Sequence, residues 1–181
     1  ALAVGDAYDT LRDELVERTN NLKVGYGLDE TSQIGTVISG AAKERIEKMI
    51  QEAIDEGATV AVDGRNIKVE GYENGTFVGP TILENVKPGM RIATEEVFGP
   101  VLALMKADSF EEAVDVVNQS HYGNAASIFT NSGKYAREFK YSVNAGNIGV
   151  NIGVAAPSAS FPFGGQKDSF YGDLHGQGSD S

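Results

Sequence analysis

Cysteine is absent from the 181-residue sequence, and basic residues are few. Without cysteine the chain can form no disulfide, no thiolate nucleophile and no Cys-ligated zinc or iron–sulfur site. Lys and Arg number 15 against 26 Asp and Glu, which gives a formal net charge of −11. Because phosphate binding requires clustered cations, this balance argues against nucleic acid and against an anionic membrane surface as partners. The lack of disulfides favours a reducing compartment.

Several familiar signatures are missing as well. No run approaches the roughly 20 apolar residues that a membrane span requires. The dinucleotide fingerprint G-x-G-x-x-G, the Walker phosphate loop and the nucleophile elbow G-x-S-x-G do not occur. The two histidines, His121 and His175, stand in turn-like contexts near glycine, so no metal site is expected. Glu95 and Glu96 are adjacent, and because neighbouring side chains point apart, they do not predict a shared-proton pair.

The first half of the sequence predicts two helices and then short strands. After an apolar opening strand, Asp6 is expected to cap a helix that runs to about Leu22. A second helix carries one apolar stripe and ends at Gly57, where a glycine is typical of a helix C-terminus. Strands are expected within 58–64, 66–71 and 76–86, with a turn at Asn74-Gly75. The stripe comprises Ile46, Met49, Ile50, Ala53 and Ile54.

From residue 101 onward, strands and helices alternate. The continuous apolar run 101–107 predicts a strand that is covered on both faces. Ser109 opens a capping box for the next helix, and Ser132 can cap a later one. Further strands are expected at 125–130 and 147–151, which gives the order strand–helix–strand–helix–strand. This order implies right-handed crossovers and a parallel sheet, the α/β class, and a glycine-rich loop follows from Gly153.

Two segments resemble the aldehyde dehydrogenase superfamily. They are TEEVFGPVLALMKA, which starts at Thr94, and GNIGVNIGVAAPSASFPFGG, which starts at Gly146. The resemblance covers essentially the whole chain and implies a three-layer α/β domain with a parallel-rich sheet, of the family's catalytic-domain type. The common family pattern has an aromatic residue where Gln166 stands. The runs GVNIGVAAP and SFYGDLHGQG are instead similar to the CoA-acylating, methylmalonate-semialdehyde branch of the family.

The resemblance implies binding roles for five residues. Glu96 would accept hydrogen bonds from the nicotinamide ribose hydroxyls of NAD, and Phe98 would pack beside the nicotinamide ring. Asn151, Phe161 and Phe163 would contact the aldehyde substrate or CoA. The implied cofactor is NAD, CoA is the implied co-substrate, and no metal is implied.

The family's nucleophile is a cysteine, so the resemblance places it upstream of Ala1, together with the oxyanion donors and the Rossmann cofactor domain. Residues 1–181 would then form the C-terminal part of the catalytic domain, with the oligomerisation strand following Ser181. This segment alone is expected to be inactive. The intact protein is expected to be a homo-oligomer that oxidises an aldehyde to an acyl-CoA, in the cytoplasm or in the mitochondrial matrix of a eukaryote.

Two alternatives stay open at this point. The intact enzyme could belong to another branch of the family, which resolves the acyl enzyme with water instead of CoA. The chain could also be a stand-alone, non-catalytic domain, which binds a partner or nucleotide through a surface inherited from a dehydrogenase. The first alternative predicts NADH formation without CoA.

Overall fold

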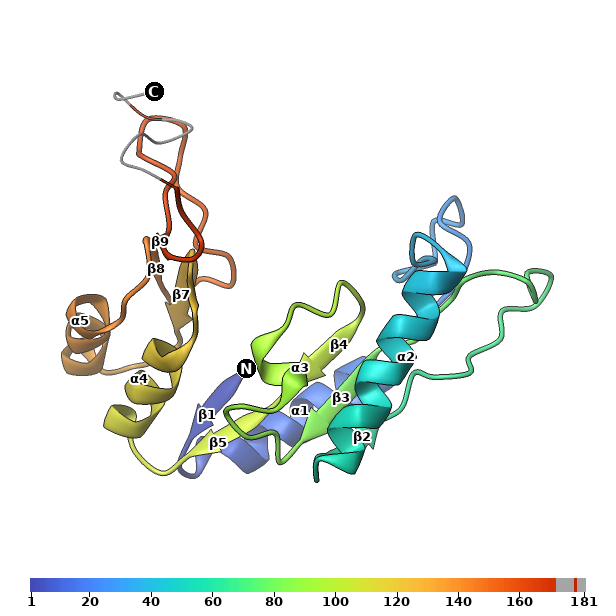
Figure 1. Ribbon diagram of the computed structural model, residues 1–181, viewed down its shortest axis with the longest axis horizontal. Coiled ribbons are helices and arrows are strands. Elements are labelled where there is room, and N and C mark those ends of the chain that lie inside the picture. The colour runs from blue at the N-terminus through green and yellow to red at the C-terminus, as the bar shows by residue number, and fades with distance from the viewer. Residues whose placement is uncertain (172–177, 179–181) are drawn as a thin grey trace. The chain divides into compact units, whose positions relative to one another are not determined.

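The computed structural model describes residues 1–171 and Gly178. The chain divides into two compact units, Ala1–Asp108 and Ser109–Ser181, and each is described by itself (Figure 1). The expectations for His175 and for the rest of 172–177 lie outside the described residues. In the part of the chain that the structure describes, no helix is long and apolar enough to cross a membrane.

The first unit contains three helices and five short strands. β2 pairs with β3 in antiparallel fashion, while β3 pairs with β4 and β1 with β5 in parallel. The elements are β1 (Leu2–Val4), α1 (Ala7–Asn20), α2 (Gly40–Asp55), β2 (Thr59–Val62), β3 (Thr81–Glu84), α3 (Arg91–Thr94), β4 (Val101–Ala103) and β5 (Met105–Ala107).

The central helix α2 forms as the apolar stripe predicts. Its N-cap residue Ser39, which the sequence reading missed, accepts a hydrogen bond from the Ala42 N–H at 3.1 Å. Gly57 follows the helix with a φ of 106°, a left-handed conformation that glycine adopts without strain. Ile46, Met49, Ile50 and Ala53 are buried, whereas Ile54 is only partly buried. The stripe therefore forms the centre of the main hydrophobic core.

Helices cover both faces of the strand region in the first unit. Leu83 of β3 and Ala103 of β4 pack in the cluster that α2 centres. Leu104, the next residue after Ala103, packs instead with Tyr8 of α1. Ala103 and Leu104 therefore pack against different helices, and α1 and α2 lie on opposite faces of the strand region, as Figure 1 shows. The three-layer α/β arrangement and the parallel-rich pairing are confirmed for this unit.

The run 101–107 differs from the single strand that its apolar pattern predicts. It is interrupted at Leu104, whose N–H donates to the Leu83 carbonyl at 2.8 Å. The first half pairs with β3 and the second half with β1. Lys106 in the second half is exposed, so the run is not covered on both faces within the described chain.

Two further expectations for the first unit are wrong. Asp6 stands before α1 but makes no side-chain capping bond, because its backbone is already helical with φ −68° and ψ −15°. The segment 66–71 forms no strand. Left-handed residues at both of its ends, Asn66 at φ 59° and Gly71 at φ 78°, turn the backbone out of the extended conformation. The turn at Asn74-Gly75 does form, closed by the Gly75 N–H on the Tyr72 carbonyl at 2.8 Å.

The second unit is built around one parallel crossover. β7 and β8 pair in parallel, and α5 connects them as the sequence predicts. Both serine caps are confirmed: Ser109 accepts a hydrogen bond from the Glu112 N–H at 3.1 Å, and Ser132 accepts one from the Tyr135 N–H at 3.3 Å. The elements are α4 (Phe110–Gln119), β6 (Tyr122–Gly123), β7 (Ala125–Ile128), α5 (Gly133–Ser142), β8 (Asn147–Val150) and β9 (Gln166–Lys167).

Two features of the strand pairing were not expected. β9, within the segment predicted to be loop, pairs in antiparallel fashion with β6. The predicted parallel pairing is confirmed for β7 and β8, whereas β5 pairs in parallel with β1, from the start of the chain. Apolar alternation predicts that a strand exists, but its hydrogen-bonding partner depends on segments distant in the sequence.

Candidate functional site

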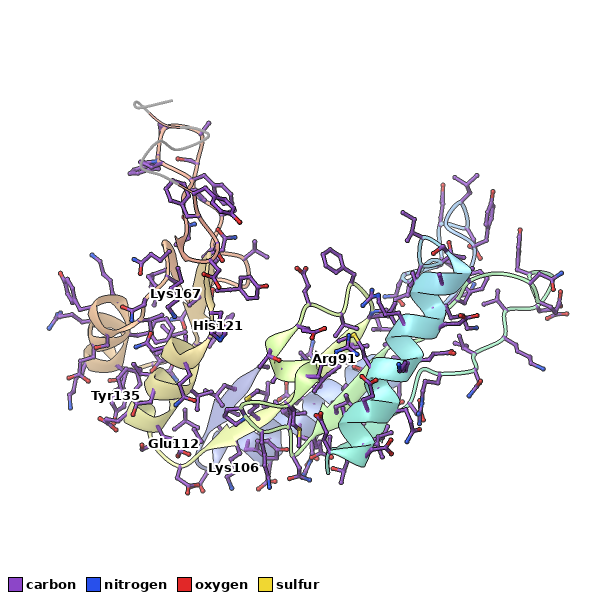
Figure 2. The ribbon with its side chains drawn as sticks, viewed as in Figure 1. Arg91, Lys106, Glu112, His121, Tyr135 and Lys167 are labelled. Carbon is purple, nitrogen blue, oxygen red and sulfur yellow. The ribbon has the colours of Figure 1, made fainter. Side chains whose placement is uncertain are left out.

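The segment 95–100, between α3 and β4, begins at an ion-pair network. Arg91 (Figure 2) donates from Nε to the Glu95 carboxylate at 2.9 Å and from Nη1 to Glu52 of α2 at 2.7 Å. The hydrogen bond from Arg91 holds the pKa of Glu52 below its ordinary value. Glu95 is thus engaged in structure, whereas its neighbour Glu96 is exposed and forms no ion pair among the described residues.

The middle of the segment is anchored on α2. Val97 is partly buried and packs against the α2 cluster, and its carbonyl accepts a hydrogen bond from Arg45 Nη2 at 2.7 Å. A β-carbon added at Gly99 would lie 2.7 Å from Ile46 Cδ1, so the backbone sits directly on the core helix there. With Val97 and Gly99 held on the α2 side, the side chains of Glu96 and Phe98 remain in solvent.

Phe98 has an unusual backbone conformation. Its φ is 49°, in the left-handed region that β-carbon-bearing residues rarely adopt, and its side chain is 73% exposed. Such a conformation costs about 1–3 kcal/mol and persists only where the surroundings impose it, which is common at ligand sites. The anchors on either side supply that constraint.

Glu96 and Phe98 offer complementary chemistry two positions apart. A carboxylate accepts hydrogen bonds from a diol, and an exposed aromatic ring can stack on a planar heterocycle. The pair suits a ribose joined to a ring. Over the described residues, no group of three or more His, Asp or Glu side chains could hold a metal ion.

In the second unit, Asn151 is fixed to the end of β7. Its Oδ1 accepts the Thr130 N–H at 2.8 Å, and its Nδ2 donates to the Thr130 carbonyl at 3.1 Å. Asn151 itself adopts a φ of 55°, which asparagine tolerates better than most residues. The amide thus sets the direction in which the chain leaves β8. Its contact with substrate stays a prediction.

Phe161 and Phe163 lie in the long segment between β8 and β9. Their side chains are 63% and 43% exposed, so neither belongs to the hydrophobic core. Close to them, Asn147 of β8 donates to the Gly164 carbonyl at 3.1 Å, and Gly146 approaches the same group so closely that a β-carbon would overlap it. The segment is therefore held to β8 just after the two aromatic residues. Their role in substrate binding stays a prediction.

Sequence reasoning missed two anchoring cations. Arg45 holds the Val97 carbonyl, as described above. Lys167 (Figure 2) donates from Nζ to the carbonyls of Asn118 and Ser120 at 3.0 and 2.9 Å, at the C-terminal end of α4. The one available signal for Lys167 is that α4 has no basic residue in its last turn, where a cation is favourable.

A cavity of about 420 Å³ lies in the second unit, beside the end of α4 and the start of β7. Its walls include Ser120, Tyr122 and Asn144. None of the five predicted site residues lines it. His121, close to this cavity in the sequence, is exposed, with Nδ1 4.0 Å from an Asp168 carboxylate oxygen.

Comparison with known proteins gives a consistent result along the chain. The model of the aldehyde dehydrogenase family matches residues 1–180. An acylating, mitochondrial methylmalonate-semialdehyde dehydrogenase of Arabidopsis thaliana is 50% identical over 172 residues, which cover 95% of this chain and 28% of that protein.

Solved structures agree with this match. A methylmalonate-semialdehyde dehydrogenase from Oceanimonas doudoroffii superposes with a TM-score of 0.95 at 41% identity, over 99% of this chain and 37% of that one. An aldehyde dehydrogenase from Mycobacterium tuberculosis, complexed with NAD+, superposes with a TM-score of 0.87 at 35% identity, over 99% of this chain and 36% of that one. The chain therefore spans between 28% and 37% of the length of these three proteins.

Proposed function

The chain belongs to the aldehyde dehydrogenase family, and from this premise we propose that it is the C-terminal part of the catalytic domain of an NAD-dependent, CoA-acylating methylmalonate-semialdehyde dehydrogenase. The intact enzyme would oxidise a semialdehyde to an acyl-CoA through a cysteine thioester. Because these residues include no cysteine, the nucleophile belongs to another part of the polypeptide. On its own, the segment would be inactive.

One observation carries the proposal: an exposed carboxylate and an exposed, conformationally strained aromatic ring share one anchored loop. Glu96 would accept hydrogen bonds from the nicotinamide ribose hydroxyls, and Phe98 would pack beside the nicotinamide ring and exclude water from it. NAD would supply the hydride acceptor. A charged acceptor and an aromatic ring on one loop can contact the ribose and the nicotinamide ring of the same cofactor.

The substrate side would be formed by the segment that leaves β8. Asn151 sets its starting direction through the two bonds to Thr130. Phe161 and Phe163 would then contact the aldehyde or CoA with their exposed rings. We place the intact enzyme in the cytoplasm, or in the mitochondrial matrix of a eukaryote, as a homo-oligomer. The mitochondrial name of the Arabidopsis relative supports this placement.

The test is NADH formation by the intact protein with methylmalonate semialdehyde, in the presence and absence of CoA. Glu96→Gln should slow hydride transfer or weaken NAD binding by about 1–3 kcal/mol, or roughly 5- to 150-fold. Glu95→Gln is the matched control: the amide oxygen of glutamine can still accept the hydrogen bond from Arg91, so the loop keeps this anchor and NAD binding should change little.

Each alternative predicts a different result. Equal NADH formation without CoA would indicate a branch that resolves the acyl enzyme with water. No NADH with any aldehyde would favour a binding domain without catalysis. If Glu96→Gln and Glu95→Gln bind NAD equally well, the assignment of Glu96 is wrong.

A further inference from the structure

We propose that Arg45 of α2 is a positioning residue, which holds Phe98 in its left-handed conformation and so presents the ring to the cofactor. The proposal rests on the proposed function of Glu96 and Phe98. Arg45 is half-buried and lies 52 positions before Val97, whose carbonyl it binds.

The contact of Arg45 is well suited to fixing a peptide plane. Its Nη2 donates to the Val97 carbonyl at 2.7 Å, and its Nη1 contacts the Met49 sulfur at 3.4 Å. A hydrogen bond from a guanidinium is shorter and stronger than one between neutral groups. Met49 is 2% exposed and belongs to the core, so the guanidinium is steadied on the rigid face of α2.

The bound carbonyl belongs to the peptide unit that precedes Phe98. A rotation of that unit changes ψ of Val97 and φ of Phe98 together, and it is the shortest route by which Phe98 could return to negative φ. The same rotation would turn the Val97 carbonyl away from Arg45 and break the hydrogen bond. The strain at Phe98 and the bond from Arg45 therefore oppose each other across one peptide unit.

Other routes of relaxation are restricted by packing. The Val97 side chain packs against the α2 cluster, and Gly99 lies against the fully buried Ile46. Moving either residue would displace core atoms that are closely packed. The Arg45 bond is thus the polar contact on which the orientation of the Val97–Phe98 peptide depends.

Arg45→Met in the intact protein removes the hydrogen bond and keeps much of the apolar volume. If the loop then spends about 90% of its time in a relaxed conformation, the apparent affinity for NAD should fall about tenfold. The Michaelis constant for the aldehyde should change far less. Arg45→Lys, which retains a donor, should recover part of the affinity.

Arg65→Met is the matched control. Arg65 is also a half-buried arginine of the first unit, but it binds Asp63 and Gln51 and makes no contact with the loop. This variant should lower the melting temperature without changing the dissociation constant for NAD, measured by calorimetry. An equal loss of NAD affinity in both variants would overturn the proposal, because the effect would then be general destabilisation.

A double-mutant cycle gives the decisive readout. If Arg45 acts through Phe98, Arg45→Met should cause little further loss of NAD affinity once Phe98→Ala has removed the ring. Fully additive losses would overturn the positioning role. If Arg45→Met does not fold, the double-mutant cycle with Phe98→Ala is measured with Arg45→Lys instead. If Glu96→Gln and Phe98→Ala both leave NAD affinity unchanged, the proposed function itself is wrong. If these two variants lose NAD affinity and Arg45→Met does not, only the positioning role of Arg45 is wrong.

Discussion

Phe98, at the centre of the proposed cofactor loop, has a strained backbone, so we expect glycine at this position to be more stable than alanine. At φ 49°, Phe98 adopts a conformation that costs a residue with a β-carbon about 1–2 kcal/mol and costs glycine almost nothing. Because the ring is 73% exposed, its removal sacrifices little buried area. Phe98→Gly and Phe98→Ala therefore differ mainly in whether the strain remains.

The expected difference follows from two opposing terms. Glycine at position 98 relieves about 1–2 kcal/mol of backbone strain. Its greater freedom in the unfolded chain costs about 0.5–1 kcal/mol relative to alanine. Phe98→Gly should therefore be more stable than Phe98→Ala by about 0–1.5 kcal/mol, centred near 0.75 kcal/mol, and should melt at the higher temperature.

The assay is thermal unfolding of the two variants of the intact protein, in the same buffer and at the same scan rate. Both variants should lose NAD affinity, because both lack the ring. A Phe98→Gly variant that melts no higher than Phe98→Ala would refute the reasoning, since it would mean that the loop is not strained. Phe98→Ala serves as the control for loss of the ring.

Two further variants test the first unit by unfolding measurements. A β-carbon at Gly64 would overlap the backbone carbonyl of Gly79, so Gly64→Ala should destabilise by about 1–3 kcal/mol, whereas Gly27→Ala, with nothing within 4 Å, should change stability little. The hydrogen bond from Arg65 lowers the pKa of Asp63 in the folded protein. The stabilisation by this pair is therefore fully present above the pKa of Asp63 in the unfolded chain, about 3.9, and is lost as pH falls through the lower pKa of the folded protein. With a 42% exposed carboxylate, Asp63→Asn should cost under about 1 kcal/mol in denaturant titrations at pH 7, and a cost that persists once Asp63 is protonated in the folded protein would contradict this.

The helices were predicted best because their signals are local. The stripe on α2 repeats at helical spacing, and the serine caps of α4 and α5 act within one turn. Asp6 shows the limit of such signals, since a capping residue type does not by itself set the backbone conformation that a side-chain cap requires. The strand 125–130 was correctly placed, and its parallel partner β8 follows from the short crossover through α5.

Strand partners were harder to predict because they depend on distant segments. The apolar pattern is the same in both halves of 101–107, yet one half pairs with β3 and the other with β1, near the start of the chain. Likewise, Gln166 and Lys167 carry no alternating pattern, and the pair of residues becomes a strand only because β6 lies beside it. Hydrophobic periodicity contains no information about such pairings.

For the candidate site, resemblance to the family selected Glu96 and Phe98, while the residues alone gave only an aromatic and a carboxylate before a Gly-Pro pair. Neither the left-handed backbone of Phe98 nor the role of Arg45 could be read from spacing, since the arginine lies 52 positions from the carbonyl it binds. A phenylalanine with positive φ breaks the local preference of its residue type, and such breaks are expected where a fold serves a ligand.

The anchors of the loop have a common origin in α2. Glu52 binds Arg91, which in turn holds Glu95; Arg45 binds the Val97 carbonyl; and Ile46 lies against Gly99. One helix thus contributes its apolar face to the core and its polar edge to the loop. Because a core helix in a closely packed unit cannot shift gradually, the loop inherits its rigidity. The strain at Phe98 is then held by the core of the first unit, and this anchoring would fix the loop in the geometry that the proposed cofactor binding requires.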